Sequence, residues 1–135
     1  MKEVSHTQPP ALALVLPAAV VALAAASVFA ATAPNQPLGD PVRGKTVYQG
    51  CTGCHSLDED DIGPRHRGVV GRAAGAVPSY VYSPGLKNSH LVWDRDTLDR
   101  WLTNPQALVP GAKMYFALSN AQDRADVIAY LAEQH

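Results

Sequence analysis

The segment Cys51-Thr52-Gly53-Cys54-His55 constrains this chain more than any other feature, because it places both cysteines of the chain directly before a histidine. Two thiols separated by two residues and followed at once by histidine form the attachment pattern of c-type haem. The thiols can bond to the two vinyl groups of a haem, and the adjacent imidazole then lies close enough to ligate the iron. The sequence therefore predicts one covalently attached haem c, with Cys51, Cys54 and His55 among its binding residues.

Other uses of a Cys-x-x-Cys pair fit this chain poorly. A structural zinc site needs about four ligands, and the chain has no second cysteine pair. A redox dithiol of the thioredoxin type expects a strand and helix pattern that the surrounding sequence lacks. A disulfide across two intervening residues is sterically poor and would leave His55 without a role. Haem attachment is the interpretation that uses all three side chains.

Met114 is the candidate for the second axial ligand of the iron. Apart from the initiator it is the only methionine, and it lies in residues 109–116, where a proline and a glycine favour an irregular segment. Taken alone, a methionine beside Tyr and Phe is more often a soft core side chain, but an upstream haem site reverses that balance. His66 and His90 are the competing ligands, and each fits better as a surface or packing residue.

Residues 1–33 predict an export or anchoring segment. Residues 11–31 carry no charge and are followed by an Ala-x-Ala cleavage signal at residues 31–33. The apolar run exceeds the usual ~7–15 residues of a signal peptide and as a helix would span about 30 Å, so retention as a membrane anchor is the alternative. The alanine richness and Pro17 favour cleavage. In both cases we expect the haem domain in the periplasm, with a membrane contact only through an uncleaved N-terminal segment.

The remaining chain is expected to form a linker at residues 34–39 and one domain at residues 40–135. Asp40 and Pro41 have the form of an N-cap and a first helical residue, and this helix leads into the haem motif. Its apolar side is expected to consist of Val42, Val47 and Tyr48.

Two further helices are expected. One runs from the cap Asp94 to Thr103, with Pro105 as its stop, and the other begins at a capping box at residues 119–122 and continues towards the C-terminus. Residues 56–90 are rich in Gly, Pro, Ser and Asp and are expected to be loops wrapped around the porphyrin. Because no alternating strand pattern is present, the fold class is predicted to be all-α.

The order of these features resembles class I cytochrome c between Gly44 and Leu131, and within that class mitochondrial cytochrome c and its soluble bacterial relatives. The motifs that carry the resemblance are, in chain order, Cys51 to His55, Gly63-Pro64, Gly71-Arg72 with Gly75, Tyr80 and Tyr82, Trp93, Asn104-Pro105, Pro110 to Phe116, and Val127 to Leu131. The resemblance implies a small cytochrome c fold whose N- and C-terminal helices cross, with loops around a covalent haem c.

The resemblance also implies roles for individual side chains. His55 and Met114 would be the axial ligands, and the Pro64 carbonyl would accept the imidazole N–H and orient the ring. Carboxylates that are half-buried in a small domain need donors or a positive charge. The side chains that match the family's partners of the haem propionates are Arg72, Tyr82 and Trp93.

Four positions depart from the family pattern. Trp101 stands where mitochondrial cytochrome c has a tyrosine bonded to the ligand methionine, and Leu86 and Ala112 replace polar residues. His66 stands where an aliphatic residue usually packs by the haem. These departures concern the distal hydrogen-bond network and the redox potential, and they leave the ligation itself intact.

The expected function is that of a monomeric one-electron carrier between a cytochrome bc-type complex and a terminal oxidase or photosynthetic reaction centre. An iron with both axial positions filled has no open site, so an enzyme is not expected. The alternative is a haem c peroxidase or ligand sensor with a labile sixth ligand, or a dedicated cytochrome subunit of a periplasmic dehydrogenase. A formal net charge of −1 gives no indication of nucleic-acid binding.

By the same resemblance, partners would dock where Phe116 and Lys113 lie by the exposed haem edge. Residues 34–135 contain only Lys45, Lys87 and Lys113 besides seven arginines. Electrostatic steering would therefore come from a local patch, and its salt dependence should be modest.

Overall fold

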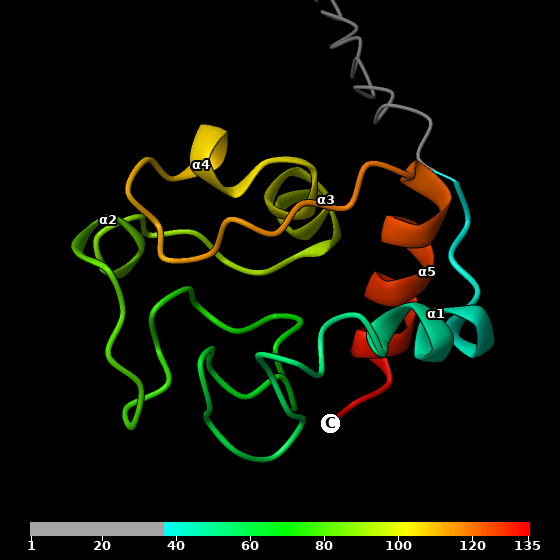
Figure 1. The fold of residues 1–135 in the computed structure, drawn as a ribbon, viewed down its shortest axis with the longest axis horizontal. Helices are drawn as coiled ribbons and strands as arrows, with labels where there is room; N and C mark the ends of the chain where they lie inside the picture. The colour runs from blue at the N-terminus through cyan, green and yellow to red at the C-terminus, as the bar shows by residue number, and fades with distance from the viewer. Residues whose placement is uncertain (1–36) are drawn as a thin grey trace, which may run out of the picture. The chain divides into compact units, whose positions relative to one another are not determined.

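A computed structural model of the chain describes residues 37–135, so the predicted signal peptide or anchor at residues 1–33 lies outside the described part, as does the start of the linker. Figure 1 shows the helices of the described part. They are α1 (Pro41–Tyr48), α2 (Pro84–Lys87), α3 (Arg95–Thr103), α4 (Pro105–Leu108) and α5 (Ala121–Ala132). Residues 37–135 contain no strand, only an isolated bridge between Ala73 and Val92. The predicted all-α fold is confirmed.

Helix α1 begins where its sequence predicts, but a different side of the helix is buried. The Asp40 carboxylate accepts hydrogen bonds from the backbone N–H groups of Val42 and Arg43, at 2.9 and 3.3 Å, and Pro41 follows as the first helical residue. Val42, however, is 78% exposed, so its expected place on the apolar side is wrong. The buried side of α1 is formed by Gly44 and Tyr48, because the helix packs closely against α5.

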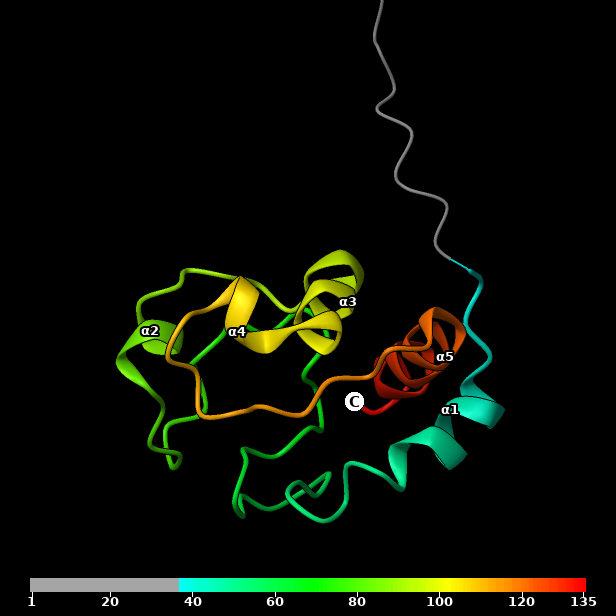
Figure 2. The ribbon, with the colours of Figure 1, turned by 45° about the horizontal axis from the view of Figure 1, so that its top comes forward.

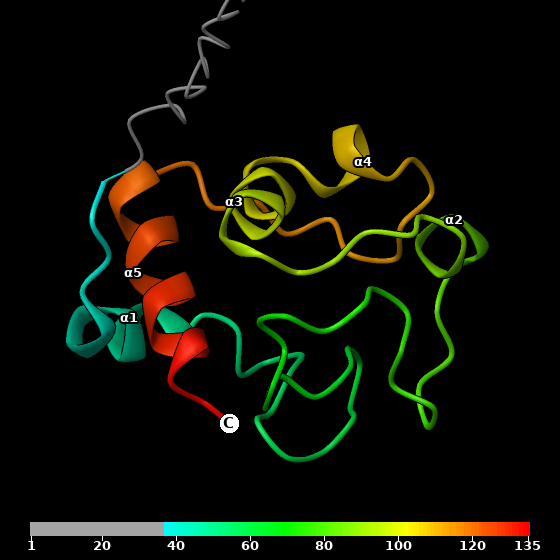
Figure 3. The same ribbon diagram turned by 180° about the vertical axis from the view of Figure 1, so that it is seen from behind.

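The crossing of α1 and α5 is the most extensive helix pair in residues 37–135, and Figures 1 and 3 show it from opposite sides. Gly44 permits the close approach: a Cβ there would lie 2.0 Å from the backbone oxygen of Asp126. Tyr48 and Tyr130 pack against each other across the crossing with ring centroids 5.2 Å apart. This is the crossing of N- and C-terminal helices that the family resemblance implies.

The Asp126 side chain is 1% exposed and joins the start of α1 to α5. It accepts hydrogen bonds from the backbone N–H of Asp40 at 2.7 Å, from Gln122 at 2.9 Å and from Arg43 at 3.1 Å. Although burial works in the other direction, these donors and the charge of Arg43 hold the pKa of Asp126 below its usual value. The crossing is therefore closed by polar contacts as well as by packing.

The other helix boundaries differ from the expected ones in detail. Asp94 caps α3 as predicted, by accepting from the Thr97 N–H at 2.7 Å. The cap of α5 is Asn120; the first residue of the expected capping box, at position 119, does not cap the helix. Pro105 ends α3 and also starts α4, and the expected loop at residues 56–90 contains the short helix α2.

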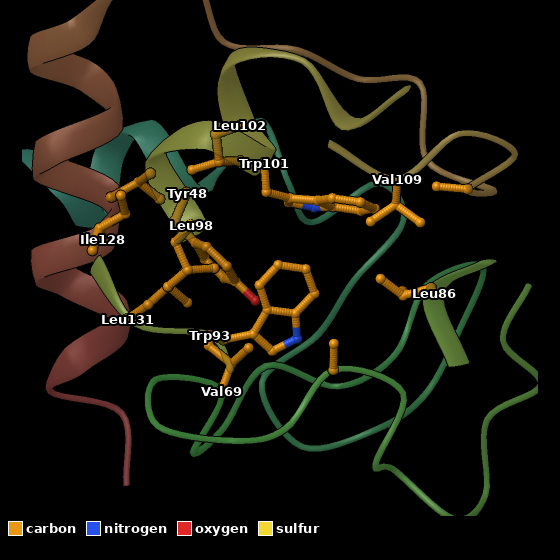
Figure 4. Packing of buried hydrophobic residues seen from close by; sticks show 13 residues of the cluster. Tyr48, Val69, Leu86, Trp93, Leu98, Trp101, Leu102, Val109, Ile128 and Leu131 are labelled. Carbon is orange, nitrogen blue, oxygen red and sulfur yellow. The ribbon is translucent and has the colours of Figure 1, made fainter. Parts of the chain in front are cut away.

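Apolar side chains of α1, α3, α5 and the loops form one core (Figure 4). Trp93 and Trp101 lie next to each other in it, with ring centroids 5.2 Å apart. Figure 2 shows the segment 109–120 running from α4 back to α5 beneath α3. No helix within residues 37–135 is both long enough and apolar enough to cross a membrane.

Candidate haem site

A cavity of about 410 Å³ is bounded by the loops, by α3 and by side chains of α1 and α5, and the predicted haem residues line it. Cofactor sites typically enclose about 300–1,000 Å³ and are mostly apolar. Cys51, Cys54, His55 and Met114 all face this one space, and large apolar side chains such as Trp93 and Leu98 complete its wall. Two thiols, an imidazole and a thioether around an apolar cavity are the donor set that a covalent haem requires. The residues present therefore fit haem c.

The Cys-x-x-Cys-His segment folds as a helical turn directly after α1. The N–H groups of Cys54 and His55 both donate to the Cys51 carbonyl, at 3.1 and 3.0 Å, and the Cys51 N–H donates to the Tyr48 carbonyl at 2.8 Å. Neither cysteine forms a disulfide, so both sulfur atoms are available for thioether bonds. Burial, followed by the neighbouring Cys54, raises the pKa of the Cys51 thiol. The turn presents both sulfur atoms and the imidazole to the same cavity.

The His55 ring is held by the backbone of the loop that follows it. Its Nδ1 lies 2.7 Å from the Pro64 carbonyl oxygen, the hydrogen bond that the resemblance implies. A Cβ on Gly63 would lie 2.1 Å from His55 Cε1, so this close approach requires glycine. When Nδ1 donates to Pro64, Nε2 keeps its lone pair for a metal. Burial lowers the pKa of His55, which favours the neutral, ligating form.

Met114 is also held by hydrogen bonds. Its Sδ accepts from Trp101 Nε1 at 3.2 Å, so the indole that replaces the family's tyrosine still donates to the thioether. Gln106 on α4 fixes the surrounding loop, because its amide donates to the carbonyls of Ala112 at 2.7 Å and of Met114 at 3.0 Å. Sequence reasoning missed Gln106. Its position right after an Asn-Pro helix start is the one signal that could have indicated it.

Arg72, Tyr82 and Trp93 all line the cavity, as expected of propionate partners. The Arg72 guanidinium donates to the carbonyls of Arg65 at 2.7 Å and Arg67 at 3.0 Å, and the Tyr82 hydroxyl accepts from the Val77 N–H at 3.4 Å. Burial lowers the pKa of Arg72 and raises that of Tyr82. Their contact with haem propionates stays a prediction.

The two histidines considered as competing ligands lie in different places. His66 lines the cavity and stacks on His55, with ring centroids 4.0 Å apart and planes at 20°. Burial, His55 and Arg72 lower the pKa of His66 to about 3. Because His66 stacks on His55, it lies on the same side of the cavity as that predicted ligand and does not face it from the opposite side. His90 does not line the cavity and has a φ of 55°.

The rim of the cavity is mostly apolar. Phe116, expected by the haem edge, lines the cavity and is 47% exposed, beside the more exposed Tyr115 and Ile62. The ammonium of Lys113 donates to the Val81 carbonyl at 2.5 Å. The ammonium at this rim thus has a hydrogen-bond acceptor within the molecule and keeps its positive charge.

Comparison with known proteins agrees with this geometry. The family model for cytochrome c matches residues 41–134, and the chain belongs to the cytochrome c family. Within that family it is a cytochrome c2-like electron carrier whose cofactor is covalently bound haem c. It is 48% identical over 120 residues to cytochrome c2 of Rhodomicrobium vannielii, covering 86% of this chain and 94% of the relative. Cytochrome c2 of Rhodoblastus acidophilus is 40% identical over 99 residues, with 70% and 92% covered.

Solved structures of bacterial cytochromes c share the fold. Cytochrome cH from Methylobacterium extorquens superposes with a TM-score of 0.68 at 38% identity, covering 70% of this chain and 98% of that one. Ferricytochrome c2 from Rhodopseudomonas palustris has a TM-score of 0.67 at 36% identity, covering 71% and 99%. The predicted class I cytochrome c fold is confirmed.

Proposed function

We propose that this protein is a periplasmic, monomeric one-electron carrier whose haem is attached through Cys51 and Cys54 and ligated by His55 and Met114. The observation that carries the proposal is that both ligand side chains line one cavity and each is already held by a hydrogen bond, His55 by Pro64 and Met114 by Trp101. A bound haem c supplies reversible one-electron chemistry at its iron.

The chain's own residues prepare both ligands. The Pro64 carbonyl selects the His55 tautomer and raises the basicity of its ligating nitrogen. Trp101 orients the Met114 thioether, while Gln106 fixes the loop that carries it. Because both ligands are held before any partner arrives, little rearrangement opposes electron transfer. The same restraint keeps a small molecule from the iron, which supports a carrier over a peroxidase or sensor.

The proposed partners are a cytochrome bc-type donor and an oxidase or reaction-centre acceptor, which meet the carrier at the cavity rim. Electron-transfer encounters bury little surface, and the exposed apolar side chains at the rim, such as Tyr115 and Phe116, would form the centre of such a small contact. Within residues 37–135, Arg72 and Lys113 are the arginine and lysine side chains that line the cavity, so the positive charge at this site is small and local. We therefore expect the rate of electron exchange with such partners to fall only modestly as the salt concentration rises.

The decisive experiment is an optical spectrum of the holoprotein in both redox states. Wild type should be low-spin and show the weak red band of ferric iron ligated by methionine sulfur. Met114→Ala should lose that band. Leu118→Ala is the matched control, since Leu118 lines the same cavity but carries no sulfur, and it should retain the band. A wild-type protein without the band, or with high-spin iron, would overturn the proposed ligation in favour of the peroxidase or sensor.

A further inference from the structure

His66 has no role in the proposed function, yet its ring touches the proximal ligand directly. The centroids of His55 and His66 are 4.0 Å apart with their planes at 20°, so His66 covers one face of the His55 ring. The hydrogen bond to Pro64 fixes one atom of that ring. A stacked neighbour restrains the plane of the ring as well, because rotation would separate the two faces.

His66 is itself fixed from the helix crossing. Its Nδ1 lies 3.2 Å from the hydroxyl of Tyr48, and its backbone N–H donates to the Ser56 carbonyl at 2.9 Å. Tyr48 is buried on α1 and packs against Tyr130 of α5. A continuous set of contacts therefore joins the α1/α5 crossing to His55. An aliphatic side chain at position 66 could fill the same space, but it could not bond to the Tyr48 hydroxyl.

We propose that His66, anchored by Tyr48, is a positioning residue that fixes the plane of the His55 imidazole and lowers the reduction potential of the haem. The proposal rests on ligation by His55. Two effects act in the same direction. A ring held in place keeps its hydrogen bond to Pro64, which makes it a more basic ligand and favours ferric iron. A polar ring beside the site also stabilises the extra positive charge of ferric iron more than an aliphatic side chain at the same position would.

The test measures the midpoint potential and the ferric EPR g-values of the holoprotein, which report the ligand planes. His66→Leu should raise the potential, changing the reduction equilibrium about threefold or more, or roughly 30 mV at 59 mV per tenfold for one electron, and should shift the g-values. Tyr48→Phe should shift the midpoint potential and the g-values in the same direction, by a smaller amount. His66→Phe keeps an aromatic face but loses the bond to Tyr48, so it should raise the potential and shift the g-values less than His66→Leu does.

Tyr130→Phe is the matched control, because it removes a hydroxyl from the same aromatic pair while leaving Tyr48 and its bond to His66 in place. It should leave both readouts unchanged. A His66→Leu protein with wild-type potential and g-values would overturn the proposal. So would a Tyr130→Phe protein that shifts as much as Tyr48→Phe. The red band of each variant reports Met114 separately: loss of the band in wild type refutes the proposed Met114 ligation, whereas shifts with the band intact test His66 alone.

Discussion

The α1/α5 crossing and the haem cavity are held together by opposite means. At the crossing, two helices meet at a glycine, and a buried carboxylate receives hydrogen bonds from both sides. Around the cavity, loops and α3 turn apolar side chains towards about 410 Å³ of space that the chain itself does not fill. The crossing is complete without a ligand, whereas the cavity is complete only with one.

This difference indicates where stability comes from. A domain of this size has a small core, and apolar surface that faces a cavity gains little until something occupies it. A group that binds only the folded chain stabilises it through that binding. Val47 of α1 and Leu131 of α5 also line the cavity, so we expect the crossing to depend less on the haem than the loops around the cavity do.

Loss of the haem should separate the two regions most strongly. The double variant Cys51→Ser with Cys54→Ser cannot form thioether bonds, so intact mass should show no covalent haem. Hydrogen exchange should then show the cavity loops nearly unprotected, while α1 and α5 keep measurable protection. Equal loss of protection in both regions would show that the crossing is not independent.

A single methyl group at the crossing should have the next largest effect. Gly44→Ala would place a Cβ 2.0 Å from the Asp126 carbonyl oxygen, and overpacking against backbone costs about 3 kcal/mol. Urea unfolding should report this loss. Gly53→Ala is the control, since a Cβ at position 53 has no atom within 4 Å, and it should unfold like wild type.

The buried carboxylate should make the crossing sensitive to acid. Asp126→Asn should destabilise the protein by about 2 kcal/mol at neutral pH, because hydrogen bonds to a charged group are lost. The pKa of Asp126 is lower in the folded protein than in the unfolded chain. The carboxylate therefore stabilises the fold fully when the pH is above the pKa of the unfolded chain. That stabilisation is lost as the pH falls through the pKa of the folded protein. Unfolding of the variant should thus depend less on pH below about 4. An unchanged acid slope would contradict this assignment.

The smallest effect is expected inside the cavity. Trp101→Phe removes the N–H that the indole donates to the Met114 sulfur. With Met114 as the proposed ligand, a thioether without that donor would give more electron density to ferric iron, so the midpoint potential should fall, by at most about 1 kcal/mol or roughly fivefold in the reduction equilibrium. Protection of α1 and α5 should stay as in wild type. A rise in potential would show that the indole acts in another way.

The features that could be predicted from the sequence are those set by neighbouring residues in the chain. Local signals predicted the haem motif, the caps Asp40 and Asp94, and the placement of Met114 in a loop, because each depends on neighbours in the chain. Family resemblance added the contact between His55 and Pro64, which the structure contains.

What sequence reasoning missed depends on partners far away in the chain. Val42 was expected to be buried because it is apolar, but α1 turns its glycine side towards α5. Asn120 caps α5 in place of the residue before it. The stacking of His66 on His55 and its bond to Tyr48 could not be predicted, since only the folded loop brings these rings together. The helical period and the cap preferences contain no information about such contacts.

The lysine side chains have a practical consequence for building electrodes from this protein. In residues 37–135, the ammonium groups of Lys87 and Lys113 donate to backbone carbonyls at 3.0 and 2.5 Å, whereas that of exposed Lys45 on α1 forms no hydrogen bond. An amine-reactive surface should therefore capture this part of the chain through Lys45 first. Molecules coupled through Lys45 would share one attachment point on α1, whereas coupling through Lys2 or an N-terminal amine would give others.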